Sequence, residues 1–149
     1  MRIMRNLTFI LACLLTMCAT IACADNDRPI EISKLPANAR QFINQHFSGS
    51  KVALAKVETE FMAKNYEVMF ADGNHIEFDS NGNWKEVDCR QTVVPSAVIP
   101  IQTSDYLKAN YPDVSVIKIE RDRREYEVKL SNRMELKFDM KFRLIDIDM

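Results

Sequence analysis

The chain has few of the residues that usually perform catalysis, with only two histidines among its 149 residues. His46 falls in a predicted helix and His75 just after a predicted hairpin turn, so no Ser-His-Asp arrangement is evident. A pair of metal-binding histidines would also need carboxylate or cysteine neighbours. We therefore expect no catalytic residues, no bound metal and no cofactor, and we predict that the chain is not an enzyme.

An apolar run long enough for a transmembrane helix, which needs about 20 residues, is also missing. The most apolar segment, residues 7–21, follows two arginines and precedes a small-x-small cleavage pattern. We predict that residues 1–24 are a signal peptide cleaved between Ala24 and Asp25, which places the mature protein in the periplasm or outside the cell. The alternative is a lipoprotein signal, in which Cys23 carries a lipid that anchors the protein to the cell envelope.

Cysteine pairs and an excess of positive charge are absent from the predicted mature chain. Three of the four cysteines lie in the leader, so Cys89 has no partner for an intramolecular disulfide, and we interpret it as a small apolar residue at a strand end. Loss of Arg2 and Arg5 leaves 18 basic residues against 21 acidic ones, a net charge of −3. Because nucleic acids select basic surfaces, this balance disfavours a nucleic-acid partner. The mature length, about 125 residues, is typical of one domain.

What the chain does contain is an internal repeat, in which residues 35–88 resemble residues 99–148. Leu35-Pro36 recurs as Ile99-Pro100 at an offset of 64. Later the offset is 60, as shown by Tyr66-Glu67-Val68 and Tyr126-Glu127-Val128. The change predicts a shorter connection in the second copy, between its first two strands.

Each copy predicts one helix followed by four antiparallel strands. A proline suits the first turn of a helix, and an apolar stripe follows it, which predicts helices near 36–47 and 100–110. Strict alternation of apolar and polar residues in the later part of each copy predicts strands with one buried and one exposed face. Asp72-Gly73 and Asn81-Gly82 indicate hairpin turns. We therefore predict an α+β fold with both helices on one face of a combined antiparallel sheet and charged residues on the other.

The same pattern predicts how the chain is organised. After the leader, residues 25–34 are expected to be a flexible N-terminus. Residues 35–90 form the first repeat, 91–98 the linker and 99–149 the second repeat. Two halves with one shared core are expected, because each half alone would be marginally stable.

The motifs resemble those of a known family. Leu-Pro-x-x-Ala-x-x-Phe-Ile-x-x-x-Phe from Leu35, Tyr-Glu-Val, and Ile-x-Phe-Asp-x-x-Gly-x-Trp-x-x-Val-Asp from Ile76 are similar to the PepSY-like domain of exported bacterial proteins. Three positions depart from the family pattern: Ser48 replaces a proline, and Arg133 and Lys141 stand where turn glycines are usual.

The resemblance implies a beta-lactamase-inhibitor-like fold, and in that inhibitor the open face of the sheet binds an enzyme. A shared fold does not by itself transfer an activity. Our hypothesis is a non-enzymatic binding module that binds or inhibits an exported enzyme or peptidase through its open sheet face. The alternative is a carrier of a small ligand or a cell-envelope component that uses the groove between the repeats. The outward positions that would form the binding surface are Met69, His75, Glu77, Lys129, Glu135 and Lys137.

Two polar segments have simpler interpretations. Residues 79–83 contain oxygens at alternate positions, but the glycine and the twelfth position do not match a calcium loop, so a turn explains them better. The mixed charges of residues 120–125 indicate a solvated hairpin tip, with an arginine-rich contact to an acidic partner as the alternative.

Overall fold

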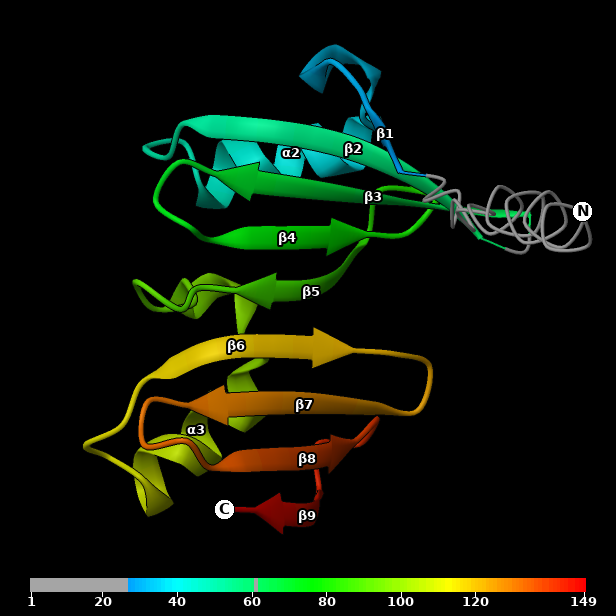
Figure 1. Ribbon diagram of the computed structural model, residues 1–149. Helices are drawn as coiled ribbons and strands as arrows, with labels where there is room; N and C mark the ends of the chain where they lie inside the picture. Colours follow the sequence, from blue (N-terminus) through cyan, green and yellow to red (C-terminus); the bar gives the residue numbers. More distant parts are fainter. Residues whose placement is uncertain (1–26, 61) are drawn as a thin grey trace, which may run out of the picture.

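A computed structural model describes residues 27–60 and 62–149 (Figure 1). These residues have an α+β fold: a single open antiparallel sheet of nine strands, with two α-helices. The strands are neighbours in sequence order, from β1 to β9. The predicted signal peptide, its cleavage between Ala24 and Asp25, and Cys23 lie outside the described residues. No helix in the described part of the chain is long and apolar enough to cross a membrane.

Each helix precedes four strands that form consecutive antiparallel pairs. The helices begin one residue after their prolines and agree with the predicted ranges. The first group is α2 (Ala37–His46), β2 (Val52–Glu60), β3 (Ala63–Phe70), β4 (His75–Phe78) and β5 (Trp84–Asp88). The second is α3 (Ile101–Asn110), β6 (Val116–Arg121), β7 (Glu125–Leu130), β8 (Glu135–Asp139) and β9 (Leu144–Asp148).

The segment before α2, which we predicted to be a flexible N-terminus, contains two short elements of regular structure. β1 (Arg28–Pro29) pairs with β2, and the Ile30 amide donates to the Ala55 carbonyl over 2.8 Å. Ile32–Lys34 forms a short 3-10 helix. Two residues are too few for an alternating pattern, so the sequence does not predict this strand. It forms because the edge of β2 offers backbone groups for pairing, and an ion pair of 2.7 Å between Lys56 on β2 and Asp27 holds the same segment.

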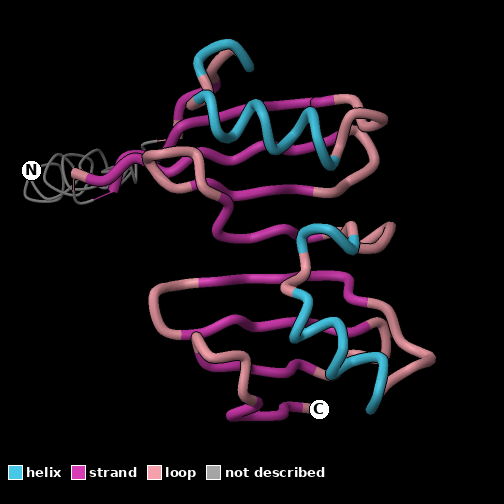
Figure 2. Tube along the Cα trace, turned by 180° about the vertical axis from the view of Figure 1, so that it is seen from behind, coloured by secondary structure: helices cyan, strands magenta, loops and turns pink. Residues whose placement is uncertain are grey.

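Both helices cover the same face of the sheet (Figure 2), because their apolar stripes pack on the alternating buried residues of the strands. Phe42 of α2 meets Phe78 of β4 edge to face, with ring centroids 5.8 Å apart and planes at 82°. Tyr106 of α3 meets Phe138 of β8 in the same way, at 5.5 Å and 79°. Phe78 and Phe138 are fully buried and belong to one contiguous core that runs under both helices.

The sheet is continuous where its two groups of strands meet. Val87 of β5 lies opposite Ile119 of β6, and both are fully buried. The segment that connects β5 to α3 contacts β6 at the same place, since the Val94 amide donates to the Val116 carbonyl over 2.9 Å. Cys89 is fully buried directly after β5, as predicted, and its burial raises the pKa of the thiol to about 11.

Four hairpin turns, those that connect β3 to β4, β4 to β5, β7 to β8 and β8 to β9, each contain one residue at a positive φ. Gly73 and Gly82 adopt φ values of 87° and 81°, as glycine readily does. In the later strands the corresponding residues are Arg133, at 76°, and Phe142, at 59°. The offset of 60 makes Phe142, rather than Lys141, the counterpart of Gly82, so our assignment of the second turn position was wrong by one residue.

Candidate functional site: the open face of the sheet

A line of five glutamates crosses the sheet face that the helices leave uncovered. Each lies directly opposite the next on the neighbouring strand, from β3 to β7. We call this line the glutamate row, and its members are Glu67, Glu77, Glu86, Glu120 and Glu127. Like charges placed directly opposite one another destabilise a sheet. Folding alone does not require such an arrangement, so it marks this face as the candidate site.

Cations beside the row offset part of this repulsion. Lys56 contacts Glu67 at 2.7 Å, and Lys118 lies 3.0 Å from Glu86 and 3.4 Å from Glu120. Lys137 approaches Glu127 at 3.5 Å. The exception is Glu77 on β4, for which the structure records neither an ion pair nor a hydrogen bond to its side chain among the described residues. Burial and the charge of Glu86 raise the pKa of the Glu77 carboxyl.

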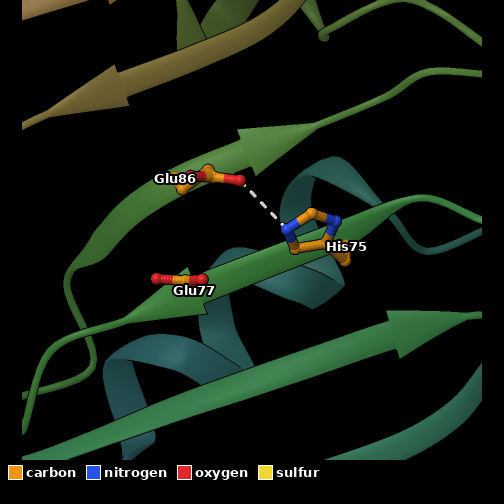
Figure 3. Close-up of side chains that lie close together, drawn as sticks. All are labelled: His75, Glu77 and Glu86. Carbon is orange, nitrogen blue, oxygen red and sulfur yellow. Dashed lines mark ion pairs between the residues drawn. The ribbon is translucent and has the colours of Figure 1, made fainter.

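His75 lies next to Glu77, the row glutamate without a cation partner in the described structure (Figure 3). Its Nε2 is 3.0 Å from Glu86 Oε1, and this contact raises the pKa of the imidazole. The same contact, helped by Lys118, lowers the pKa of Glu86 to about 2. One ligand atom from each of His75, Glu77 and Glu86 lies within 4.8 Å of the others. The sequence analysis missed the carboxylate neighbours of His75 because Glu86 comes from the next strand.

A pocket of about 250 Å³ opens beside the C-terminal part of the row. Asp88 lines it and is only 2% exposed, which is unusual for an aspartate. Its Oδ2 accepts a hydrogen bond from Arg90 Nε over 2.9 Å, whereas no donor within the described residues reaches the buried Oδ1. A buried carboxylate oxygen without a donor is costly. The pocket therefore has an unused acceptor, and its other walls include Lys118, Lys129 and Glu135.

The six residues predicted to form the binding surface all lie on this face, on β3, β4, β7 and β8. Met69 lies opposite His75, and its side chain is 41% exposed. Lys129 forms an ion pair with Glu135 on the neighbouring strand. Their role in binding stays a prediction. The sequence analysis missed four glutamates of the row and Asp88, because only the strand register brings them into line.

The segments that we interpreted as turns form turns. Asp79 Oδ1 accepts hydrogen bonds from the backbone amides of Asn81, at 2.8 Å, and Asn83, at 2.9 Å. Asp122 Oδ1 accepts from the amides of Arg124 and Glu125 in the same way. These acceptors are used by the backbone, as turn chemistry predicts.

A second hollow, of about 510 Å³, lies where β5 and β6 meet, near the ends of the hairpins. Trp84, Arg121 and Tyr126 are among the residues that line it. The Arg121 guanidinium lies 4.1 Å from the centre of the Trp84 ring and donates to the Trp84 carbonyl over 2.8 Å. Arg121 therefore joins the two groups of strands, which differs from the solvated position that we expected for residues 120–125.

Residues 64–146 match the family model described as "Putative beta-lactamase-inhibitor-like, PepSY-like". The chain belongs to the PepSY-like family. This membership agrees with the resemblance that the paired motifs indicate. No curated protein matches the chain.

The solved structures that share the fold include three periplasmic proteins. A protein from Bacteroides thetaiotaomicron, described as a "putative calcium-regulated periplasmic protein", is 61% identical, with a TM-score of 0.83 over 85% of this chain and 99% of the other. A periplasmic protein of the DUF2874 family from Bacteroides vulgatus is 51% identical, with the same TM-score and coverage. Another periplasmic protein from Bacteroides vulgatus, of unknown function, is 42% identical, with a TM-score of 0.79 over 83% and 99%. All three are described as periplasmic proteins.

Proposed function

We propose that this protein is a non-enzymatic periplasmic binding module that presents the open face of its sheet to another exported protein, such as an enzyme or a peptidase. The glutamate row carries the proposal. The described structure keeps like charges opposite one another across five strands, although this arrangement costs stability. Both helices leave this face free, so a partner can reach it (Figure 2).

The charge of the row determines the chemistry of the partner. Neighbouring strands lie about 4.8 Å apart, so the row spans about 19 Å, a fair part of a standard protein interface. A partner with a basic strip would relieve the repulsion between the glutamates, which favours both encounter and specificity. The buried Asp88 Oδ1 would accept a hydrogen bond from a donor that the partner inserts into the adjoining pocket.

The effect of calcium on partner binding should also be measured, because the Bacteroides thetaiotaomicron relative is described as calcium-regulated. Carboxylate oxygens are the ligands that Ca²⁺ prefers. Bound to the row, the ion would neutralise the charge that a basic partner recognises. We therefore expect calcium to weaken partner binding if the row is the docking surface.

The experiment is crosslinking in periplasmic extract, with the wild-type protein and two matched variants as bait. Glu120→Gln with Glu127→Gln removes two charges from the row. Asp105→Asn with Asp113→Asn removes two exposed charges from α3 and the loop after it, away from the open face. We expect a saturable partner that the first variant loses and the second keeps. Equal capture by both variants, or no saturable partner at all, would contradict the proposal.

A carrier function is the second candidate, favoured by the hollow at the junction of β5 and β6. Its volume, about 510 Å³, lies in the range of small-molecule sites, and Trp84 and Tyr126 supply aromatic walls. Native mass spectrometry of protein purified from its own host separates the candidates, since a carrier retains a bound small molecule and a docking module does not.

A further inference from the structure

Three metal-ligating side chains meet at one place on the open face (Figure 3). His75 and Glu77 are two residues apart on β4, so their side chains leave the strand on the same face. Glu86 lies directly opposite Glu77 on β5. Among the described residues, these three form the one group of His, Cys, Asp or Glu side chains whose ligand atoms lie within 4.8 Å of one another.

The donor set suits a transition metal better than calcium. One imidazole nitrogen and two carboxylate oxygens supply three ligands of a tetrahedral Zn²⁺ site and leave the fourth position for water or for a group from a partner. Calcium, in contrast, requires six to eight oxygens. Because a strand pair holds all three ligands, backbone hydrogen bonds fix their spacing.

The surrounding contacts allow a metal to enter with little rearrangement. Glu86 uses Oε2 to contact Lys118 at 3.0 Å, while its Oε1 faces His75. Lys118 can therefore keep orienting the carboxylate while Oε1 turns to a metal, as outer contacts do at metal sites. The charges of Glu86 and Glu67 help to raise the pKa of Glu77, so a cation at this place relieves an existing repulsion.

We propose that His75, Glu77 and Glu86 form a binding site for a divalent transition metal ion of the Zn²⁺ type. On binding, the proton that His75 shares with Glu86 leaves to solvent, and the metal takes its place between Nε2 and Oε1. The site goes beyond the docking function: a basic partner needs the whole row, whereas the metal needs only these three groups.

The test uses full-length mature protein without a histidine tag, stripped of metal and titrated with ZnCl₂. Calorimetry measures stoichiometry and affinity, and NMR follows the two imidazole rings, since His46 is the other histidine of the chain. We expect one saturable site, with His75 ring signals that shift and His46 signals that do not. His75→Ala and Glu77→Gln should each weaken binding by more than about tenfold, because even outer contacts of a metal site account for about 10–100-fold.

The matched controls are His46→Ala and Glu127→Gln, which remove a histidine and a row glutamate outside the group. Both should bind Zn²⁺ like the wild type. Unchanged affinity in His75→Ala and in Glu77→Gln, or Ca²⁺ that binds as tightly as Zn²⁺, would overturn the proposal. Loss of Zn²⁺ binding in the controls would also overturn it. None of these results affects the docking proposal, which the crosslinking variants test separately.

The pH dependence of binding gives an independent readout. His75 faces Glu67, Glu77, Glu86 and Asp88, with Lys118 behind Glu86, and its pKa is raised chiefly by the hydrogen bond to Glu86. A proton therefore competes with the metal, and Zn²⁺ affinity should rise as the pH rises through the pKa of His75. An affinity that does not change between pH 6 and pH 8 would show that His75 is not a ligand.

Discussion

The two groups of strands share a scaffold but differ in the charges on the open face. Positions 60 residues apart compare directly: Tyr66 with Tyr126, and Phe78 with Phe138, on the helix side of the sheet. On the open face, Glu77 corresponds to Lys137, and His75 corresponds to Glu135. At these two positions the first group therefore has a histidine and a glutamate, whereas the second has a glutamate and a lysine.

The difference shows that the core and the open face follow separate requirements. In the second group the charges neutralise one another, since Lys137 pairs with Glu127 and Lys129 with Glu135. In the first group, Glu86 lies beside His75, whose charge depends on pH. A surface that needed only solubility would resemble the second group, which agrees with our placing the metal site in the first group, whereas the glutamate row spans both groups.

Removing a core ring should destabilise both groups by about the same amount. We expect Phe78→Ala and Phe138→Ala each to reduce the free energy of unfolding by about 3–5 kcal/mol, because both rings are fully buried in one core. Urea unfolding, followed by the fluorescence of Trp84, measures the change. Two separate transitions in either variant would mean that the groups do not unfold as one unit.

Substitution by alanine should destabilise the protein more at Gly82 than at Gly73, because the added Cβ would come too close to neighbouring atoms at Gly82. Backbone strain alone does not distinguish the two positions. A Cβ at Gly82 would lie 2.7 Å from the Cβ of Pro36 and 2.8 Å from the Ala39 nitrogen. At Gly73 the nearest atom would be a side-chain carbon of Gln91 at 3.5 Å. We expect Gly82→Ala to cost about 1–3 kcal/mol through overpacking against α2, and Gly73→Ala to cost about 1 kcal/mol.

Thermal unfolding of the two variants measures this difference. Phe142, which adopts φ 59° where Gly82 adopts 81°, shows that a side chain can occupy the backbone conformation itself. Equal losses in the two variants would therefore attribute the whole effect to the backbone.

The pH dependence of stability should have opposite signs at His75 and at Glu135. The folded pKa of His75 is raised above 6.5 by the hydrogen bond to Glu86, so its contribution is complete below pH 6.5 and is lost as the pH rises through the folded pKa. The pKa of Glu135 is lowered by Lys129, so its contribution is present above pH 4.5 and is lost as the pH falls.

Chemical denaturation of the wild type, His75→Gln and Glu135→Gln between pH 3 and pH 9 checks these signs. For His75 we expect an effect of about 1 kcal/mol or less, because the pair is partly exposed. We expect the stability advantage of the wild type over His75→Gln, measured as the free energy of unfolding, to decrease as the pH rises. An advantage that increases with pH would show that the contact with Glu86 does not stabilise protonated His75.

Neutralising corresponding positions of the two groups should give effects of opposite sign at pH 7. Glu77→Gln removes a repulsion with Glu67 and Glu86 and should stabilise the protein by about 0.2–1 kcal/mol. Lys137→Gln removes the pair with Glu127 and should destabilise the protein slightly, because this pair is exposed to solvent. Urea titrations at low and high salt measure both changes, which should shrink as salt increases. Destabilisation by Glu77→Gln would show that an attractive contact of Glu77 outweighs the repulsion.

Local patterns allowed much of the fold to be predicted. Proline followed by an apolar stripe located both helices to within a residue or two, and Gly73 and Gly82 marked two turns correctly. These features depend on residues close together in the sequence. β1 was missed, because its two residues carry no pattern and it forms only by pairing with β2.

The candidate site was predicted only in part, for a physical reason. Alternation shows that Glu77 and His75 face outward, but not which residues lie opposite them. That depends on register, and β4 and β5 include an irregularity between Glu77 and Phe78 that shifts it. Glu86 therefore became visible as a neighbour of His75 only in three dimensions.

The last strand, β9, is an edge strand whose outer backbone groups are unpaired within the described chain. β9 has β8 on one side and no strand on the other within the described chain, and Ile145 and Ile147 are exposed on it. Such edge strands can recruit the same strand from another molecule and grow into fibres. Asp146 and Asp148 place negative charges along this edge, so a second copy aligned against it would meet repulsion. This charge therefore disfavours the addition of a second copy along β9 and limits aggregation of the folded protein.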